Sequence, residues 1–338
     1  MIRPDLDSLP AYVPGVRDER AIKLSSNECA EEPLPAVVDA MARSLRSVNR
    51  YPDMGALEIR EALAAHLGVA VDQVAVGTGS SALCQQLVEI AAQPGDEVIF
   101  PWRSFEAYPI FAQVVGATGV PVALDRNHRV DLPAMAAAVT TRTKLIFVCN
   151  PNNPTGTTIT NDEFAAFMDA VPTDVIVALD EAYFEYNRAA DTPVATDVIT
   201  RYRNVVGLRT FSKAYGLAGA RIGYAFGPER IIAALNKVAI PFSVSSMAQV
   251  AALASLEATA ELESRIDDTT SQRERVVAKL GLGESQANFV WIPDAPAELP
   301  ERLAEEGVLV RAFPEGVRVT VTNAAETDAF LEAWDRAQ

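Results

Sequence analysis

One lysine of this chain lies in a segment where its amine could do chemistry. Lys213 belongs to the string RTFSKAYGLAGARIG, which begins at Arg209 and surrounds the lysine with hydroxyl, glycine and apolar residues. An amine that loses solvent in such surroundings has a lowered pKa and becomes a nucleophile. Arg221, in the same string, offers a planar fork of donors that suits a phosphate. A surface lysine and arginine in a glycine-bearing loop are the plain alternative.

A glycine turn forms a second candidate site. The string GTGSS at residues 77–81 lies between a short apolar run and a helix that we expect to begin at Ser80. Free N–H groups at a helix N-terminus bind anions, and glycines allow close approach, so a phosphate fits here. A tight turn with a serine cap is equally compatible. The residues also match a dinucleotide fingerprint with Asp96 as its acid, but Asp96 precedes the next strand, where the fingerprint needs an acid at the strand's end.

Two further polar strings follow apolar runs. The string NPNNPTG begins at Asn150, after residues 145–149, and Asp180 and Tyr183 follow residues 175–179. Prolines make the first loop rigid, and open α/β sheets place ligands at the carboxyl ends of their strands. An acid at such an end points into the crevice, where a phenol three residues later reaches the same ligand. An ordinary turn and a solvated acid are the alternatives.

The elements that must position these residues alternate between strand and helix. A helix is predicted over Ser80–Ala92, and it stops at Pro94 and Gly95. Strands are predicted at residues 74–76, 97–100, 145–149, 175–179, 205–208 and 221–225. This alternation predicts an α/β fold with a mostly parallel sheet and helices on both faces.

The last hundred residues have a different pattern, which predicts a smaller α+β domain. A long amphipathic helix runs through Arg275, and short strands follow at residues 289–292, 308–311 and 317–321. Neither a repeat nor a flexible linker marks a boundary. We therefore divide the chain by fold into an N-terminal segment that returns to the small domain (1–45), a large ligand-binding domain (46–240) and a small C-terminal domain (241–338).

The composition limits the classes of molecule that this protein is expected to bind. The 338 residues are 49% hydrophobic, which is enough for a large core, and the net charge of -16 argues against nucleic acid and anionic membranes. A small-molecule partner is expected. Three scattered cysteines and two histidines offer neither a disulfide framework nor a metal site, and they suit a reducing cytoplasm. Neither a signal peptide nor a membrane span of about 18 apolar residues is visible.

Together, the four strings resemble the fold-type I pyridoxal-phosphate-dependent aminotransferases. Within them, the chain is most similar to the branch that contains histidinol-phosphate and aromatic amino acid aminotransferases. Several short sequence strings resemble those of the actinobacterial aromatic amino acid aminotransferases in particular. They are NRYPD at Asn49, VGTGSSALCQQL at Val76, WRSFEAYP at Trp102, SQANFVW at Ser285 and VRVTV at Val317. The similarity extends over essentially the whole chain.

The resemblance implies a role for each matching residue. Lys213 would hold pyridoxal phosphate as a Schiff base and later move the substrate's proton, and Asp180 would keep the ring nitrogen protonated. Asn153 and Tyr183 would hydrogen-bond the phenolic oxygen of the cofactor. The remaining cofactor contacts are a ring-stacking Phe105 and a phosphate site of Gly79, Ser80, Thr210, Ser212 and Arg221.

The same resemblance implies shared active sites and a substrate clamp. Tyr51 matches a residue that reaches the phosphate in a neighbouring subunit, which implies a homodimer. Arg318 matches the arginine that holds the substrate α-carboxylate. Residues that would complete the substrate end are Tyr12, Asn288 and Arg311. Phe105 in place of a common tyrosine, and GTGSS in place of an acidic turn, weaken a direct transfer of the histidinol-phosphate specificity.

The expected activity is transfer of the amino group of phenylalanine, tyrosine or tryptophan to 2-oxoglutarate by a ping-pong cycle. The alternative substrate is histidinol phosphate, because the arginines suit either. A related decarboxylase is a more distant possibility. A nicotinamide dehydrogenase would leave Lys213, Asn153 and Asp180 without roles, and a silent binding module has no need for a desolvated lysine beside a fixed arginine.

Overall fold

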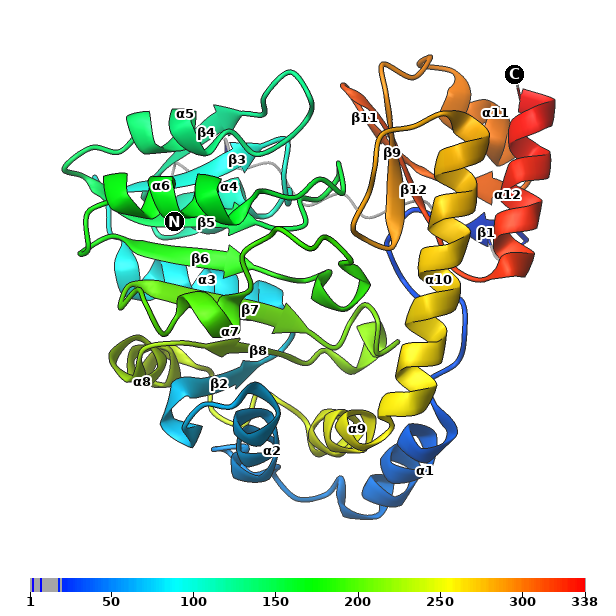
Figure 1. Cartoon of the computed structure of the whole chain (residues 1–338). Helices are drawn as coiled ribbons and strands as arrows, with labels where there is room; N and C mark the ends of the chain where they lie inside the picture. Colours follow the sequence, from blue (N-terminus) through cyan, green and yellow to red (C-terminus); the bar gives the residue numbers. More distant parts are fainter. Residues whose placement is uncertain (1, 3–6, 8–17, 19, 338) are drawn as a thin grey trace.

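The structure, a computed structural model, describes residues 2, 7, 18 and 20–337. Its largest element is a seven-stranded sheet, seen on the left of Figure 1. The strand order is β2 (Val74–Gly77), β8 (Gly223–Phe226), β7 (Val205–Thr210), β6 (Ile176–Asp180), β5 (Thr143–Cys149), β3 (Glu97–Trp102) and β4 (Thr118–Ala123). Adjacent strands from β7 to β4 pair in parallel, whereas β8 is antiparallel to both neighbours. The predicted mostly parallel sheet is thus confirmed.

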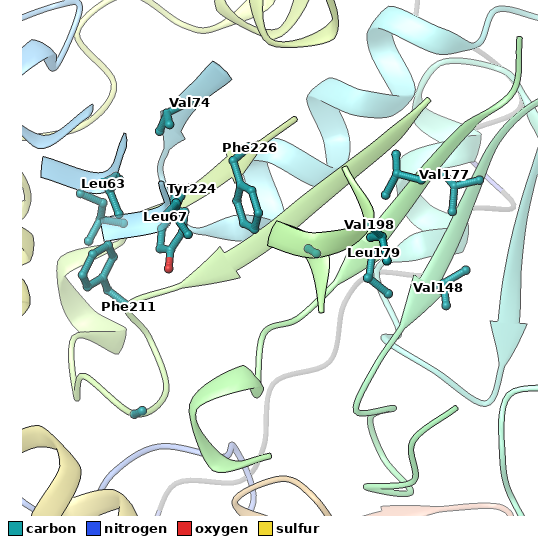
Figure 2. Packing of buried hydrophobic residues seen from close by; sticks show 14 of the residues in the cluster. Leu63, Leu67, Val74, Val148, Val177, Leu179, Val198, Phe211, Tyr224 and Phe226 are labelled. Carbon is teal, nitrogen blue, oxygen red and sulfur yellow. The ribbon is translucent and has the colours of Figure 1, made fainter. Parts of the chain in front are cut away.

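Both faces of this sheet are buried, which explains why its strands are continuous apolar runs. Along β5, Ile146 and Val148 pack into one hydrophobic cluster, and Leu145 and Phe147 pack into another on the opposite face. Figure 2 shows part of the first cluster, in which Val148 lies among residues of neighbouring strands. Helices cover both faces, as the alternation of strands and helices predicted.

Helices of different lengths surround this sheet (Figure 1). They are α1 (Pro35–Ser44), α2 (Leu57–Leu67), α3 (Ser80–Ala91), α4 (Tyr108–Val114), α5 (Leu132–Ala137), α6 (Asn161–Ala170), α7 (Ala195–Val198), α8 (Glu229–Val238) and α9 (Ser246–Glu257). Single 3-10 turns occur at η2 (Leu45–Ser47), η3 (Val71–Gln73), η4 (Phe184–Tyr186) and η5 (Ala218–Ala220). Among the residues that the structure describes, a helix suited to crossing a bilayer is not found.

The C-terminal region builds a second, smaller layer beside the large sheet. Its antiparallel sheet has the order β11 (Arg311–Phe313), β12 (Gly316–Thr320) and β9 (Phe289–Pro293). The long helix α10 (Thr259–Leu280) runs alongside it, and α11 (Leu299–Glu305) and α12 (Ala324–Ala337) lie beyond α10 at the right of Figure 1. The chain also returns here near its start, because β1 (Ile22–Lys23) pairs in parallel with β10 (Val308–Leu309).

Several predicted boundaries were wrong. The strand expected at 221–225 begins at Gly223, because Arg221 adopts a left-handed backbone with φ 58°. The strand expected at 308–311 is two strands that join different sheets, and α10 continues beyond Arg275. Strand β4 was not predicted, since it contains Gly119 and Pro121; as an edge strand it tolerates them. The division at residues 45/46 and 240/241 stays a prediction.

A buried ion pair joins two strand ends next to the candidate site. Arg209 Nε lies 2.8 Å from Glu181 Oε2, and the two side chains are only 3% and 2% exposed. Glu181 Oε1 also accepts a hydrogen bond from the N–H of Ala195 (2.7 Å), and the Arg209 guanidinium stacks over the Phe184 ring at 3.4 Å. Each charge therefore depends on the other for compensation in the core.

Replacing Arg209 with methionine leaves the Glu181 carboxylate buried without its cation. We expect the free energy of unfolding to fall by about 3–5 kcal/mol. Urea unfolding followed by circular dichroism measures the change. The control Arg336→Met breaks an exposed pair with Glu306 and should cost less than about 1 kcal/mol. Equal losses in the two variants would contradict the importance of burial.

Candidate active site

A cavity of about 480 Å³ opens where the carboxyl ends of the parallel strands face the small sheet. The predicted residues that line it are Ser80, Phe105, Asn153, Asp180, Tyr183, Thr210, Ser212, Lys213, Arg221, Arg311 and Arg318. They come from loops and strand ends separated by more than two hundred residues in the sequence. The structure thus brings the four strings and the two C-terminal arginines into one site.

One end of the cavity is built from hydrogen-bond donors around the start of α3. Gly79 has φ +80°, and a Cβ at this position would lie 2.4 Å from Arg221 Nη2. A Cβ at Gly223 would lie 2.4 Å from the backbone nitrogen of Ser80. The two glycines therefore allow the arginine and β8 to approach the helix N-terminus closely. Arg221 Nη1 also donates to Ser212 Oγ (3.3 Å), so guanidinium, hydroxyl and helix N–H groups gather where a phosphate would fit.

A buried carboxylate lies at another wall of the cavity. Asp180 is 4% exposed, and its oxygens accept hydrogen bonds from the Tyr108 hydroxyl (2.6 Å) and the Ala182 N–H (3.2 Å). Burial raises the pKa of Asp180 to about 6, although these two hydrogen bonds act in the opposite direction. A carboxylate in this position gains from a cationic N–H donor, such as a protonated ring nitrogen.

The lysine is held between these groups. Lys213 Nζ donates to the backbone carbonyl of Ser26 (3.1 Å) and lies 5.9 Å from the centre of the Tyr183 ring. Burial, and to a smaller extent the positive charge of Arg318, lower the pKa of Lys213 to about 8. Near pH 8, a substantial fraction of the Lys213 amine is therefore neutral, as a nucleophile requires.

Polar groups from both sides of the cavity meet in its lining. Asn27 Nδ2 donates to the Tyr183 hydroxyl (2.9 Å), and Arg318 Nη1 donates to Asn153 Oδ1 (2.5 Å). Arg318 Nη2 also donates to the backbone carbonyl of Ser25 (2.6 Å). The small sheet and the segment around residue 26 thereby close the cavity that the large sheet opens.

Three predicted site residues do not line this cavity, and a fourth falls outside the described residues. Gly79 is the N-cap of α3. Asn288 is buried next to Asn27, and its Nδ2 donates to the Asn27 carbonyl (3.2 Å). Tyr51 is 82% exposed and stacks on Phe242, with ring centroids 4.6 Å apart. Tyr12 lies outside the part of the chain that the structure describes.

The structure also adds residues that the sequence analysis missed. Tyr108 and Glu106 belong to the same string as Phe105, WRSFEAYP, so their closeness to Phe105 in the sequence was a usable signal. Asn27 and Ser26 had no comparable signal. They reach the site only because β1 pairs with β10 and brings the chain's early segment across the cavity.

Comparison with known proteins agrees with this geometry. The family described as aminotransferase class I and II matches residues 19–333. An aromatic amino acid aminotransferase of Corynebacterium glutamicum (strain R) is 64% identical over 338 residues, which cover 99% of this chain and 98% of that protein. One from Mycobacterium bovis (strain BCG / Pasteur 1173P2) is 52% identical, with 98% and 96% covered.

Solved structures give the same result for the fold. The histidinol-phosphate aminotransferase from Sinorhizobium meliloti, in complex with pyridoxal-5'-phosphate, superimposes with a TM-score of 0.89 at 28% identity, covering 99% of this chain and 97% of that one. The aspartate aminotransferase from Thermotoga maritima reaches 0.85 at 21% identity, with 99% of each chain covered. The chain belongs to the aminotransferase class I and II family, and it is a fold-type I pyridoxal-phosphate-dependent aminotransferase, as its four strings predicted.

Proposed function

We propose that this enzyme transfers the amino group of phenylalanine, tyrosine or tryptophan to 2-oxoglutarate through pyridoxal phosphate. The observation that carries the proposal is the single cavity in which Lys213, Asp180 and the donors at the start of α3 meet. Relatives that are 59–64% identical over 99% of this chain are named aromatic amino acid aminotransferases, which supports the aromatic substrate class.

The residues present fit the cofactor. Arg221, Ser212, Thr210 and the N–H groups that follow Gly79 would bind its phosphate, and the Asp180 carboxylate would accept a hydrogen bond from its protonated ring nitrogen. Phe105 lines the same space and would pack on the ring. When bound, pyridoxal phosphate supplies an aldehyde that reacts with amines and a ring that takes up electrons released at the substrate Cα.

The chain's own groups would handle protons and orientation. Lys213 Nζ would join the aldehyde and, after the substrate amine displaces it, accept the proton from the substrate Cα and deliver it to the cofactor's C4′. Asp180 would pair with the protonated cofactor ring, because burial disfavours its charged carboxylate unless a cation lies beside it. The Tyr183 hydroxyl and Asn153 would hydrogen-bond the cofactor's phenolic oxygen, and Arg318, which already bridges Asn153 and Ser25, would clamp the α-carboxylate.

The substrate's side chain would occupy an apolar wall. Phe105, Ile110 and Phe111 line the cavity from the loop after β3 and from α4, and they offer the flat apolar contacts that an aromatic ring prefers. Histidinol phosphate is the alternative substrate, because the relative from Sinorhizobium meliloti is named for it and Arg311 and Arg318 both face the cavity. A comparison of kcat/KM for phenylalanine and histidinol phosphate on one preparation decides between them.

We propose further that the enzyme is a cytoplasmic homodimer of amino-acid biosynthesis. Large apolar side chains are exposed around α1, α2 and the connection from α8 to α9, which lie near one another at the bottom of Figure 1. They are Val38, Leu45, Val48, Tyr51, Met54, Leu57, Val238, Ile240 and Phe242. Such an apolar surface is typical of an interface. Tyr51 would reach the cofactor phosphate of the partner subunit from this surface.

The free thiols of Cys29, Cys84 and Cys149 suit a reducing compartment, which supports the proposed cytoplasmic location.

Lys213→Ala should abolish the yellow absorbance of the reconstituted enzyme and lower kcat by at least about a thousandfold, because nucleophile and base are both lost. Lys279→Ala, which removes an exposed lysine paired with Asp335, serves as the control and should retain both properties. Borohydride reduction followed by peptide mapping should find the pyridoxyl group on residue 213. A labelled peptide from elsewhere would refute the assignment.

The rate at which apoenzyme combines with pyridoxal phosphate should rise with pH through about 8 and then level off, because only the neutral Lys213 amine reacts. Arg318→Met removes a positive charge that lowers this pKa, so its profile should move to higher pH. Stopped-flow absorbance from about pH 6.5 to about pH 9.5 measures both profiles. Coincident profiles for the two proteins would contradict the role of Arg318.

Ile240→Asp places a charge in the exposed apolar surface and should convert the dimer to monomers with little activity. Ala304→Asp adds the same charge at an exposed position on α11 and should leave the dimer intact. Sedimentation velocity measures the assembly of both. A wild-type protein that sediments as a monomer at micromolar concentration would contradict the proposal.

A further inference from the structure

A buried network of hydrogen bonds reaches the Tyr183 hydroxyl from the small sheet. Asn27 Nδ2 donates to Tyr183 Oη (2.9 Å), and Asn27 Oδ1 accepts from Thr320 Oγ1 (3.1 Å). The backbone N–H of Asn27 also donates to Thr320 Oγ1 (2.9 Å). Asn27 and Thr320 are each only 1% exposed, so water has little access to these contacts. Thr320 ends β12 of the small sheet, whereas Tyr183 follows β6 of the large one.

The direction of each hydrogen bond in this network follows from one fixed donor. A backbone N–H can only donate, so Thr320 Oγ1 accepts from Asn27 and has its own proton left for Asn27 Oδ1. The NH2 group of the Asn27 amide then faces Tyr183. A reversed amide would place its NH2 group against Thr320, and the buried threonine hydroxyl would lose its acceptor, which is unfavourable.

This arrangement determines where the Tyr183 proton can go. A hydroxyl oxygen that accepts from Asn27 directs its own proton elsewhere, and Tyr183 lines the cavity, so the proton is available to a ligand there. Burial raises the pKa of Tyr183, and the hydroxyl therefore keeps its proton near neutral pH. Accepting one hydrogen bond also makes a hydroxyl a stronger donor in another.

The second group assigned to the cofactor's phenolic oxygen is oriented from the same strand. Arg318 Nη1 donates to Asn153 Oδ1 (2.5 Å), so the NH2 group is the end of the Asn153 amide that can donate to a ligand. Arg318 and Thr320 are two residues apart on β12, and their side chains therefore lie on the same face of this strand. One face of the small sheet thus orients both groups as donors.

We infer that Asn27 and Thr320 are positioning residues, which make the Tyr183 hydroxyl a hydrogen-bond donor toward the cofactor's phenolic oxygen. The inference rests on the proposed function, which assigns Tyr183 to that oxygen. A donor stabilises negative charge on the oxygen, and this charge is least compensated when the nearby nitrogen contributed by Lys213 loses its proton. The donor should therefore lower the pKa of that nitrogen. Without it, the enzyme should keep its yellow absorbance to a higher pH.

The first test removes the hydroxyl that orients Asn27. Thr320→Val keeps the shape of the side chain, but the Asn27 amide can then reverse, and Tyr183 can donate to it instead of to the cofactor. The pH midpoint at which the reconstituted enzyme loses its yellow absorbance should rise by about 1. Thr320→Ser retains a hydroxyl and should restore the wild-type midpoint. The matched control Thr322→Val removes a buried hydroxyl that donates to Glu326 (2.7 Å) and should leave the midpoint unchanged.

A purely structural role predicts a different result. If the network only fastened residue 27 to the two sheets, Thr320→Val would lower the free energy of unfolding in urea without moving the midpoint. That outcome would overturn the inference, as would equal shifts in Thr320→Val and Thr322→Val.

A double-mutant cycle tests the same inference without changing Thr320, and it decides the matter if Thr320→Val does not fold. Asn27→Asp replaces the NH2 donor with an oxygen that accepts the Tyr183 proton, and aspartate tolerates the left-handed backbone of residue 27 (φ 55°). In the Tyr183→Phe background only the added charge acts. The rise in midpoint caused by Asn27→Asp should be larger by about 1 when the Tyr183 hydroxyl is present. Equal rises in the two backgrounds would contradict the inference.

The outcomes separate this inference from the proposed function. A wild-type protein that never becomes yellow with pyridoxal phosphate would overturn both. A wild-type enzyme that prefers histidinol phosphate to phenylalanine would overturn the proposed substrate, whereas the predicted shifts in midpoint would still support the roles of Asn27 and Thr320, because the phenolic oxygen belongs to the cofactor. A yellow enzyme with one midpoint in all variants would overturn this inference alone.

Discussion

Loss of solvent around two ionisable groups is the constraint on which this active site depends. Burial disfavours the charged form of each group, so it lowers the pKa of Lys213 to about 8 and raises that of Asp180 to about 6. The amine becomes a better nucleophile, and the carboxylate gains from any cation that reaches it. A cofactor with an aldehyde for the amine and a protonated nitrogen for the carboxylate meets both requirements in one molecule, which gives a physical reason for pyridoxal phosphate at this site.

Sheet topology explains why these groups meet. Parallel strands end at the same edge, so Asp180 at the end of β6 and Thr210 at the end of β7 reach the same edge of the sheet, and the loop that carries Asn153 follows β5. The reversed strand β8 begins at this edge, which brings Arg221 to the start of α3. Close approach there requires glycine at positions 79 and 223, since a Cβ at either would collide with its neighbour.

The charges at the substrate end of the cavity are arranged differently from those at the cofactor end. Donors at the start of α3 accumulate positive character for a phosphate, whereas Arg311 is offset by Glu106 before any substrate arrives.

The sequence by itself determined the chemistry and the architecture of the large sheet. Apolar runs with polar residues at their ends predict parallel strands and a ligand edge, and the strings around Lys213, Asp180 and Asn153 carry their chemistry locally, in residue type and spacing. Only the tertiary structure decided which distant residues complete the site. Asn27 reaches Tyr183 because β1 pairs with β10, Asn288 is buried behind Asn27, and Arg311 meets Glu106 across two sheets. These contacts depend on long-range pairing and packing, which leave no periodicity in the residues that make them.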